Sequence, residues 1–509
     1  MRQFGNYNDM SFRPASIGLL PLLTLFVSGA VVASEPVNFI LLMGDDHGWE
    51  ETGYYDHPHV KTPVIDEMAS QGLRFDYFYS AHSSCSPTRG SFLTGRHPNR
   101  YGTFTPGYSI RPEEITIAHL LKSKGYRCGH FGKWHIGPVK SASPTNPGAM
   151  GFDDYVSHDN FFEMNPPMSR QGAPPEVIKG ESSAIVVDEA LRFINEAEAD
   201  DSPFLAVLWF GSPHEPYSGL EEDLALYDNL PEELENKEVS LTSNETGKRV
   251  KRPLRAVLRE RYAEITAMDR AIGTLRDALR EKEMHQNTLV WFCSDNGTPP
   301  SAPLATPFRG QKGQLFEGGI RVPGIIEWPA RITEPRITEM TAVTSDILPT
   351  LCDIAEIPLP DRPLDGISLL PLIQGDITKR EEPVGFWHFS RPDAGAKPYI
   401  DPELQKGTTP LVKESGGLLT RNFRNYHHPA IRDRDYLGDR AWIDGHYKLF
   451  VRDGKDGTVQ KQLYDLRNDI DESEDIAAAH AERVEAMATQ LRTWQESVLQ
   501  SLRGDDYLP

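Results

Sequence analysis

Residues 37–48 read VNFILLMGDDHG, a near-continuous apolar run that ends in two carboxylates and a histidine. Three later stretches have the same form: residues 126–135 (YRCGHFGKWH), 204–214 (FLAVLWFGSPH) and 288–297 (TLVWFCSDNG). Continuous apolar runs, unlike strict alternation, are typical of strands that are covered on both faces of a sheet. The four stretches therefore predict buried strands, each followed by a polar loop.

Helical patterns lie between these strands. Residues 115–124, 184–196 and 255–283 carry apolar side chains at steps of three and four, the spacing of one helix face. Strands that alternate with helices predict an α/β fold with a mostly parallel sheet. Because ligands bind outside the carboxyl ends of the strands in such sheets, we expect the four polar clusters to form one site.

The composition changes after Gly366, where short strand patterns precede a final amphipathic helix. These strands are predicted at residues 385–389, 441–451 and 462–466, and the helix at 476–502. The pattern predicts a smaller C-terminal α+β subdomain with an antiparallel sheet. We place the catalytic domain at residues 34–375 and the subdomain at 376–509. Residues 391–439, rich in proline, glycine and charge, are predicted to be a long surface insertion.

The N-terminus has the features of a secretory signal. Positive charge precedes the apolar residues 17–27, and small residues lead up to Ala33, so we expect residues 1–33 to be removed. A retained anchor or a lipid attachment is the alternative. However, the apolar run is slightly shorter than the roughly 20 residues of a spanning helix and contains Pro21. We therefore expect a periplasmic or secreted protein that does not bind a membrane after cleavage.

The overall composition excludes some classes of function. The chain has 509 residues and a formal net charge of -21, which argues against a nucleic-acid-binding protein because such proteins need a basic face. An anionic substrate would need a local basic pocket. Only four cysteines are present, so the chain is not a disulfide scaffold and we expect no disulfide.

Oxygen-bearing side chains follow two of the predicted strands. Asp45 and Asp46 follow the first, and Asp295 and Asn296 follow the last. Three carboxylates and an amide carbonyl suit a hard cation such as Ca²⁺ or Mg²⁺ better than zinc. Each pair alone is also explained as a helix cap or a turn. Their shared position at one sheet edge favours a metal.

Basic residues accompany these carboxylates. The candidates are Arg89, Lys133 and Lys312, together with His135 and His214. Each could instead be an ordinary solvated group. Their positions at strand ends and in a glycine-bearing loop favour a shared pocket. A divalent metal, fixed cations and two histidines describe a site for a small tetrahedral oxyanion ester.

A nucleophile for this site is found in residues 83–96, SSCSPTRGSFLTGR. Cys85 begins a C-x-P-x-R pattern that ends at Arg89. Taken alone, Cys85 is most simply a small core residue. As a thiolate it would suit a soft metal, which conflicts with the hard-cation site predicted beside it. This mismatch indicates that Cys85 is not used as a thiol.

The chain resembles the sulfatase family, within the alkaline-phosphatase-like superfamily. The resemblance rests on CSPTR at residues 85–89, GKWH at 132–135, SDNG at 294–297 and EGGIRVP at 317–323, and extends from Asn38 to about Asp471. It implies a large mixed, mostly parallel sheet flanked by helices. It also implies that a maturation enzyme oxidises Cys85 to Cα-formylglycine.

The resemblance implies a role for each candidate residue. Asp45, Asp46, Asp295 and Asn296 would bind one Ca²⁺, with the hydrated aldehyde of residue 85 also near the metal. One hydroxyl of that hydrate would attack sulfur. Arg89 would hold the hydrate, Lys133 and Lys312 would bind sulfate, His214 and Lys312 would protonate the leaving alcohol, and His135 would deprotonate the second hydroxyl to expel sulfate.

The expected function is removal of sulfate from a sulfated carbohydrate. One alternative is a phosphomonoester, phosphodiester or phosphonate hydrolase of the same superfamily, and another is a catalytically silent protein that binds sulfated glycans. Residues 160–170, 216–227 and 391–439 could build the pocket wall. The last segment contains Arg421 and Arg424, which either contact further anionic groups of a sugar chain or belong to a solvated loop.

Overall fold

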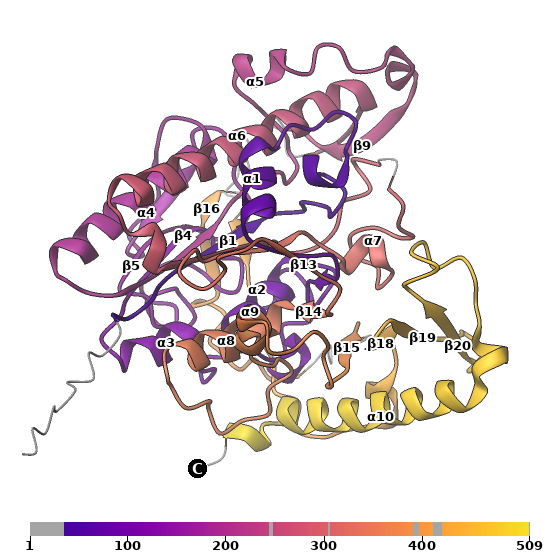
Figure 1. Cartoon of the computed structure of the whole chain (residues 1–509). Helices are drawn as coiled ribbons and strands as arrows, with labels where there is room; N and C mark the ends of the chain where they lie inside the picture. The colour runs from indigo at the N-terminus through magenta and orange to yellow at the C-terminus, as the bar shows by residue number, and fades with distance from the viewer. Residues whose placement is uncertain (1–34, 244–247, 304–305, 390–395, 411–419, 508–509) are drawn as a thin grey trace, which may run out of the picture. The chain divides into compact units, whose positions relative to one another are not determined.

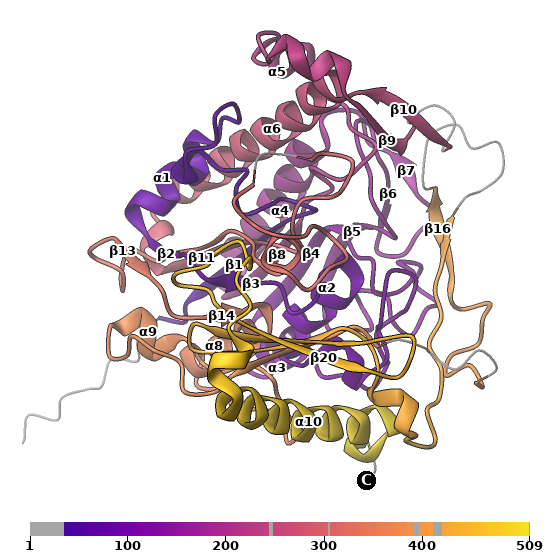
Figure 2. The same ribbon diagram turned by 90° about the vertical axis from the view of Figure 1, so that its right-hand side faces the viewer.

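The four predicted strands are neighbours in the middle of a ten-stranded sheet (Figures 1 and 2). In sheet order they are β11 (Thr288–Ser294), β1 (Asn38–Gly44), β8 (Phe204–Trp209) and β4 (Arg127–Lys133). All three pairings between them are parallel. Their carboxyl ends therefore lie along one edge of the sheet, as predicted.

This computed structural model describes residues 35–243, 248–303, 306–389, 396–410 and 420–507. The predicted signal segment, residues 1–33, lies outside the described residues. Among the residues that are described, no helix is both long enough and apolar enough to cross a membrane.

Shorter strands extend the sheet on both sides. Beyond β4 come β5 (Asp154–His158), β6 (Pro167–Arg170) and β7 (Glu176–Val177), and beyond β11 come β12 (Gly324–Glu327), β2 (Leu73–Phe75) and β13 (Arg336–Thr338). β5 pairs with β4, and β13 with β2, in parallel, whereas the four other outer pairings are antiparallel. The predicted mixed, mostly parallel sheet is confirmed.

Helices cover both faces of the sheet, which explains the continuous apolar runs. Along β1, Phe39 and Leu41 alternate with Ile40 and Leu42, and the two sets belong to separate buried clusters on opposite faces. One face is covered by α1 (Pro63–Gln71), α4 (Ser182–Ala199) and α6 (Leu254–Glu281), and the other by α2 (Cys85–Thr94), α3 (Ile117–Lys122), α8 (Ile347–Ile354) and α9 (Leu370–Gln374). The three helices predicted between the strands are α3, α4 and α6.

The predicted C-terminal antiparallel sheet is present. Its strands, in sheet order, are β15 (Val384–Trp387), β18 (Arg440–Asp444), β19 (Tyr447–Asp453) and β20 (Val459–Asp465). The final helix, α10 (Ala481–Arg503), packs Val484, Met487 and Leu491 against apolar side chains of this sheet. A 3₁₀ turn at Ala477–His480 precedes it, so the α-helix begins later than predicted. The domain boundary after residue 375 stays a prediction.

The remaining described strands and α-helices are short. They are β3 (Phe78–Tyr79), β14 (Ala342–Val343), α5 (Glu221–Ala225), β9 (Glu238–Thr242), β10 (Arg249–Pro253), α7 (Glu317–Ile320), β16 (Lys406–Pro410) and β17 (Thr420–Asn422). β9 pairs with β10, β14 with β3, and β16 with β17.

Within residues 391–439, which are predicted to be a surface insertion, β16 and β17 form a hairpin (Figure 2) whose strand residues are exposed or half-buried, with the exception of one threonine. Its residue Thr409 is fully buried. The carboxylate of Asp159, just after β5, accepts hydrogen bonds from the backbone nitrogens of Thr408 and Thr409 at 2.5 and 2.7 Å. The hairpin is polar in sequence, yet it docks because one buried carboxylate satisfies its backbone.

A buried ion cluster joins the C-terminal sheet to the sulfatase-like motif at residues 317–323. Lys448 Nζ on β19 lies 2.9 Å from carboxylate oxygens of both Glu317 and Glu472, and all three side chains are fully buried. We expect Lys448→Met to lower the free energy of unfolding by about 3–5 kcal/mol, because two buried carboxylates lose their cation.

Urea denaturation would measure this loss. The matched control is Lys461→Met on the neighbouring strand β20, where Lys461 pairs with the exposed Glu485. That variant should lose less than about 1 kcal/mol. Equal losses in the two variants would contradict the structural importance of the buried cluster.

Candidate active site

The polar clusters meet at the carboxyl ends of the central strands. The backbone nitrogen of Asp46, after β1, donates to Asp295 Oδ1, after β11, at 3.0 Å. Lys133 Nζ at the end of β4 lies 2.5 Å from Asp45 Oδ2. His214 follows β8, and its Nε2 lies 3.7 Å from Asp46 Oδ2. Residues distant in the sequence therefore form one site, as predicted.

Cys85 is the first residue of α2 and points into this site. Its Sγ lies 3.9 Å from Asp46 Oδ1, and the residue is buried. Pro87 is tolerated here because the first turn of a helix has no internal partner for its backbone N–H, and the left-handed Gly95 ends the helix. Burial raises the pKa of the Cys85 thiol to about 12, so the thiol stays protonated and is a poor nucleophile.

Arg89 lies one turn after Cys85 on the same face of α2. Its Nε and Nη2 donate to Asp295 Oδ2 at 3.1 and 2.6 Å, and its Nη1 donates to the carbonyl oxygen of Lys133 at 3.1 Å. Arg89 and Asp295 are both fully buried. This guanidinium therefore fixes α2 against the ends of β11 and β4.

Lys312 reaches the same carboxylates from the loop after β11. Its Nζ lies 2.6 Å from Asp46 Oδ1. The backbone nitrogen of Gly313 donates to the carbonyl oxygen of Ser83 at 2.8 Å, which ties this loop to the residues just before α2. Burial lowers the pKa of Lys312, but the combined attraction of Asp46, Cys85, Asp45 and Asp295 outweighs burial, so this pKa lies well above its usual value. Lys312 therefore carries a proton at neutral pH.

The two histidines differ in their hydrogen bonding. Both ring nitrogens of the buried His135 lack a hydrogen-bond partner, and burial holds its pKa well below the usual value. A neutral imidazole at that place can accept a proton. The ring of His214 stacks on Phe161 at 4.7 Å, and burial lowers its pKa to about 3. His214 Nδ1 donates to the carbonyl oxygen of Glu215 at 2.5 Å, which leaves Nε2 facing Asp46.

The oxygen atoms around Cys85 fit a hard cation. Asp45 Oδ1 and Asn296 Oδ1 are buried and have no hydrogen-bond partner. Ligand atoms of Asp45, Asp46, Cys85 and His214 lie within 4.8 Å of one another. Burial, with Asp45 adding to it, raises the pKa of Asp295 to about 6, so a nearby positive charge would favour its ionised form. An oxygen-rich, crowded set of this kind suits Ca²⁺ or Mg²⁺.

A pocket of about 350 Å³ opens over these groups. Its lining includes Asp46, Ser84, His214, Arg249, Ser301 and Lys312. Arg249, on β10, pairs with Glu215 at 2.5 Å beside His214. No local pattern in the sequence distinguishes Arg249, because it is one of several charged residues in a polar hairpin. The pocket is large enough to admit a sugar-sized group.

Arg261 on α6 is a supporting residue that no motif in the sequence indicates. It is fully buried and donates to the carbonyl oxygens of Asp46 and Pro213, both at 2.6 Å, and to both carboxylate oxygens of Glu51. It therefore holds the loops that carry Asp46 and His214. The sequence signal for this role is that Arg261 lies among the apolar residues of the helix face, where a buried charge needs hydrogen-bonding partners.

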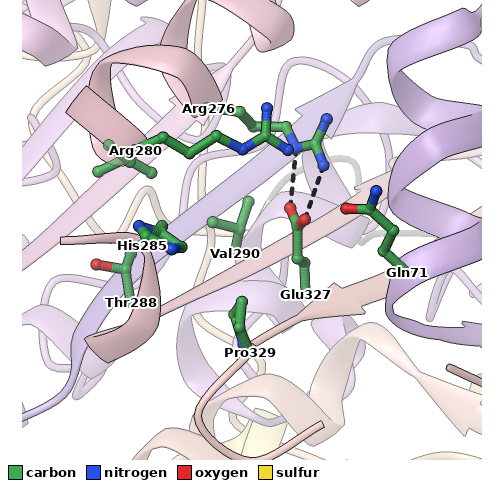
Figure 3. Close-up of a pocket in the computed structure, with 9 residues that line it drawn as sticks. Gln71, Arg276, Arg280, His285, Thr288, Val290, Glu327 and Pro329 are labelled. Carbon is green, nitrogen blue, oxygen red and sulfur yellow. Dashed lines mark hydrogen bonds and ion pairs between the residues drawn. The ribbon is translucent and has the colours of Figure 1, made fainter. Parts of the chain in front are cut away.

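A second pocket, of about 80 Å³, lies away from this chemistry (Figure 3). It is lined by Thr288 at the start of β11 and Glu327 at the end of the antiparallel β12, so it lies at the opposite edge of the sheet. Glu327 is already held by Arg276 at 2.7 and 2.9 Å. The carboxylate of this pocket is thus already paired, and we assign the pocket no catalytic role.

Comparison with known proteins identifies the family. A family model for sulfatases matches residues 37–357. The N-acetylgalactosamine-6-sulfatase of Canis lupus familiaris is 31% identical over 402 residues, 71% of each chain. The ulvan-active sulfatase of Formosa agariphila is 30% identical over 66% of this chain and 65% of its own. The structure of Ps i-CgsB in complex with k-i-k-neocarrahexaose aligns with a TM-score of 0.71 at 21% identity, over 92% of this chain and 94% of the other.

Proposed function

Because this chain belongs to the sulfatase family and is therefore a hydrolase of sulfate esters, we propose that its substrate is a sulfated carbohydrate. The main support is the convergence of Arg89, Lys133 and Lys312 on an oxygen-rich cation site at residue 85. Relatives that are named for sulfated sugars or polysaccharides favour this substrate class.

Two lysines are proposed to bind the sulfate group. In the structure, Lys133 pairs with Asp45 and Lys312 with Asp46, and Lys312 also lines the open pocket. Ammonium groups offer three donors each, so both can bond a sulfate oxygen while they keep a carboxylate partner. The two ammonium groups would orient the ester and offset the negative charge that develops during transfer.

A divalent cation is proposed to occupy the site of Asp45, Asp46, Asp295 and Asn296, near residue 85. The unpaired oxygens of Asp45 and Asn296 support this assignment, and Ca²⁺ is the cation that the family resemblance implies. When bound, it supplies positive charge beside the sulfate. Arg89 favours the ionised form of Asp295 and holds this carboxylate in place through two hydrogen bonds.

Residue 85 is proposed to act as Cα-formylglycine after oxidation of Cys85 by a maturation enzyme. The hydrated aldehyde supplies a hydroxyl nucleophile, which a hard cation accommodates better than a thiol. The raised pKa of the encoded thiol supports this change of group. The N-terminal position of residue 85 on α2 directs it at the substrate and leaves Arg89 one turn behind it.

The remaining side chains are proposed to move protons. Lys312, which is protonated, and His214, whose Nε2 faces the carboxylates, stand on the pocket side where an alcohol would leave. Lys312 can donate directly to the leaving oxygen once that oxygen becomes basic, and His214 can do so after its Nε2 has taken up a proton. His135 lies on the β4 side with two free ring nitrogens, so it is the base that can deprotonate the second hydroxyl and allow sulfate to be expelled.

Parallel assays would test the proposed function. Protein produced with its maturation enzyme should hydrolyse an aryl sulfate and a sulfated saccharide faster than the matching phosphate and phosphonate esters. Preference for a phosphate or phosphonate ester would favour the alternative hydrolase. Tight binding of sulfated glycans by fully matured protein, with no turnover of any ester, would favour a silent binding protein.

We propose that this reaction takes place in the periplasm or outside the cell. The support is the signal-like sequence of residues 1–33. N-terminal sequencing of the mature protein should begin near Ser34, and a mature chain that still begins at Met1 would contradict cleavage.

A further inference from the structure

The hairpin of β16 and β17 brings an arginine to the wall of the active site. Just after β17, the backbone nitrogen of Arg424 donates to the carbonyl oxygen of Gly107 at 3.0 Å, and Ser109 donates back to Arg424 at 2.9 Å. The next residue, Ile110, donates to the carbonyl oxygen of Ile136 at 2.8 Å. One short segment therefore separates β17 from the loop that carries His135.

Arg421 projects toward that loop. The ring of Phe423 lies edge-on to the ring of His135, with centroids 6.5 Å apart. Side chains two residues apart on an extended chain point to the same side, so Arg421 shares the direction of Phe423. The positive charge of Arg421 interacts electrostatically with both Cys85 and His135.

Arg421 is a largely buried cation without a bound anion. Its Nε is buried and has no hydrogen-bond partner, and no carboxylate among the described residues pairs with it. Arg89 and Arg261 at the same site are each held by a carboxylate. A partly desolvated guanidinium that has no carboxylate partner costs free energy, which a bound anion would recover.

We propose that Arg421 binds a second anionic group of the substrate, a carboxylate or a further sulfate on the sugar, beside the sulfate that is removed. This inference rests on the proposed function. The guanidinium fork can bond either oxyanion through two parallel hydrogen bonds. The sulfate that reacts already has Lys133, Lys312 and the cation site, and Arg421 contacts none of the carboxylates there.

The hairpin provides a matched control for the experiment. Arg424 lies three residues after Arg421, is exposed, and stacks on the ring of Tyr108 at 4.5 Å. We would compare Arg421→Ala, Arg421→Lys and Arg424→Ala on four substrates: an aryl sulfate, a singly sulfated sugar, a disulfated sugar, and a sulfated sugar that carries a carboxylate.

For Arg421→Ala we expect kcat/KM to fall about 10- to 100-fold further on a substrate with a second anion than on the aryl sulfate or the singly sulfated sugar, mainly through KM. The disulfated and carboxylated substrates show which anion is recognised. Arg424→Ala should behave as wild type on all four. Arg421→Lys keeps the positive charge but cannot form the two parallel hydrogen bonds of a guanidinium, so its loss of kcat/KM should be smaller than that of Arg421→Ala but not zero. If Arg421→Ala does not fold, Arg421→Lys replaces it in the comparison.

Equal losses on all four substrates would overturn the inference. A binding measurement tests this inference separately from the proposed function. Calorimetry in a Cys85→Ala background, with the disulfated and carboxylated sugars, should show weaker binding when Arg421 is replaced. If this difference persists while matured wild type hydrolyses no sulfate ester, the proposed function fails and the role of Arg421 stands. If wild type is active and the difference is absent, Arg421 is not the second-anion site.

Discussion

Cys85→Ala is expected to lower the turnover of a sulfate ester by about 10⁴-fold or more, the scale seen when an enzyme loses its nucleophile. The remaining cations and carboxylates would still bind the ester but would have no group to attack sulfur. Alanine is a good residue for the start of α2, and the lost volume is small, so the fold should persist. Initial rates would measure the loss, and circular dichroism would verify the fold.

The matched control is Cys352→Ala. Cys352 is another buried free thiol, but it lies on α8 within the apolar core. Its replacement should cost some stability and leave the kcat of a matured protein near that of wild type. In active wild type, mass spectrometry of the peptide that contains residue 85 should show the aldehyde. An unmodified thiol at residue 85 in fully active protein would contradict the proposed chemistry.

The residues at the carboxyl edge of the sheet could be predicted because the local sequence shows where each buried strand ends. Residues 39–43 are apolar without interruption, since one face of β1 packs against α4 and α6 and the other against α2 and α8. Each such run stops where the chain leaves the core, and the next residues are polar. For parallel strands this places Asp45, Lys133 and Asp295 at one edge without any knowledge of long-range contacts.

The position of the hairpin could not be predicted in this way. Residues 406–410 are polar and read as a surface loop, yet Thr409 is buried because Asp159 satisfies its backbone and hydroxyl. That contact joins residues 250 apart in the sequence, and no local period encodes it. The same holds for Arg261, whose burial depends on carbonyl oxygens from two other loops. Among the arginines of the insertion, only the structure distinguishes Arg421 from Arg424.

Asp295→Ala is expected to abolish both the binding of a divalent cation and turnover. Asp295 is the carboxylate that joins the cation site to Arg89, and its removal takes away one oxygen donor and leaves a fully buried guanidinium beside Asp45 without its closest anion. Loss of that anion should lower the free energy of unfolding by about 3–5 kcal/mol. Metal analysis of the purified protein, calcium titration and initial rates would measure the three effects.

Loss of stability alone could reduce activity, so the control must break an equivalent ion pair away from the metal. Asp365 serves this purpose: it is largely buried and holds Arg100 at 2.7 and 2.8 Å, but it belongs to the contact between α10 and the segment before α3. Asp365→Ala should lose comparable stability and keep its cation. If Asp295→Ala also keeps a full complement of metal, Asp295 serves only to position Arg89, and the cation site must be assigned to the other carboxylates.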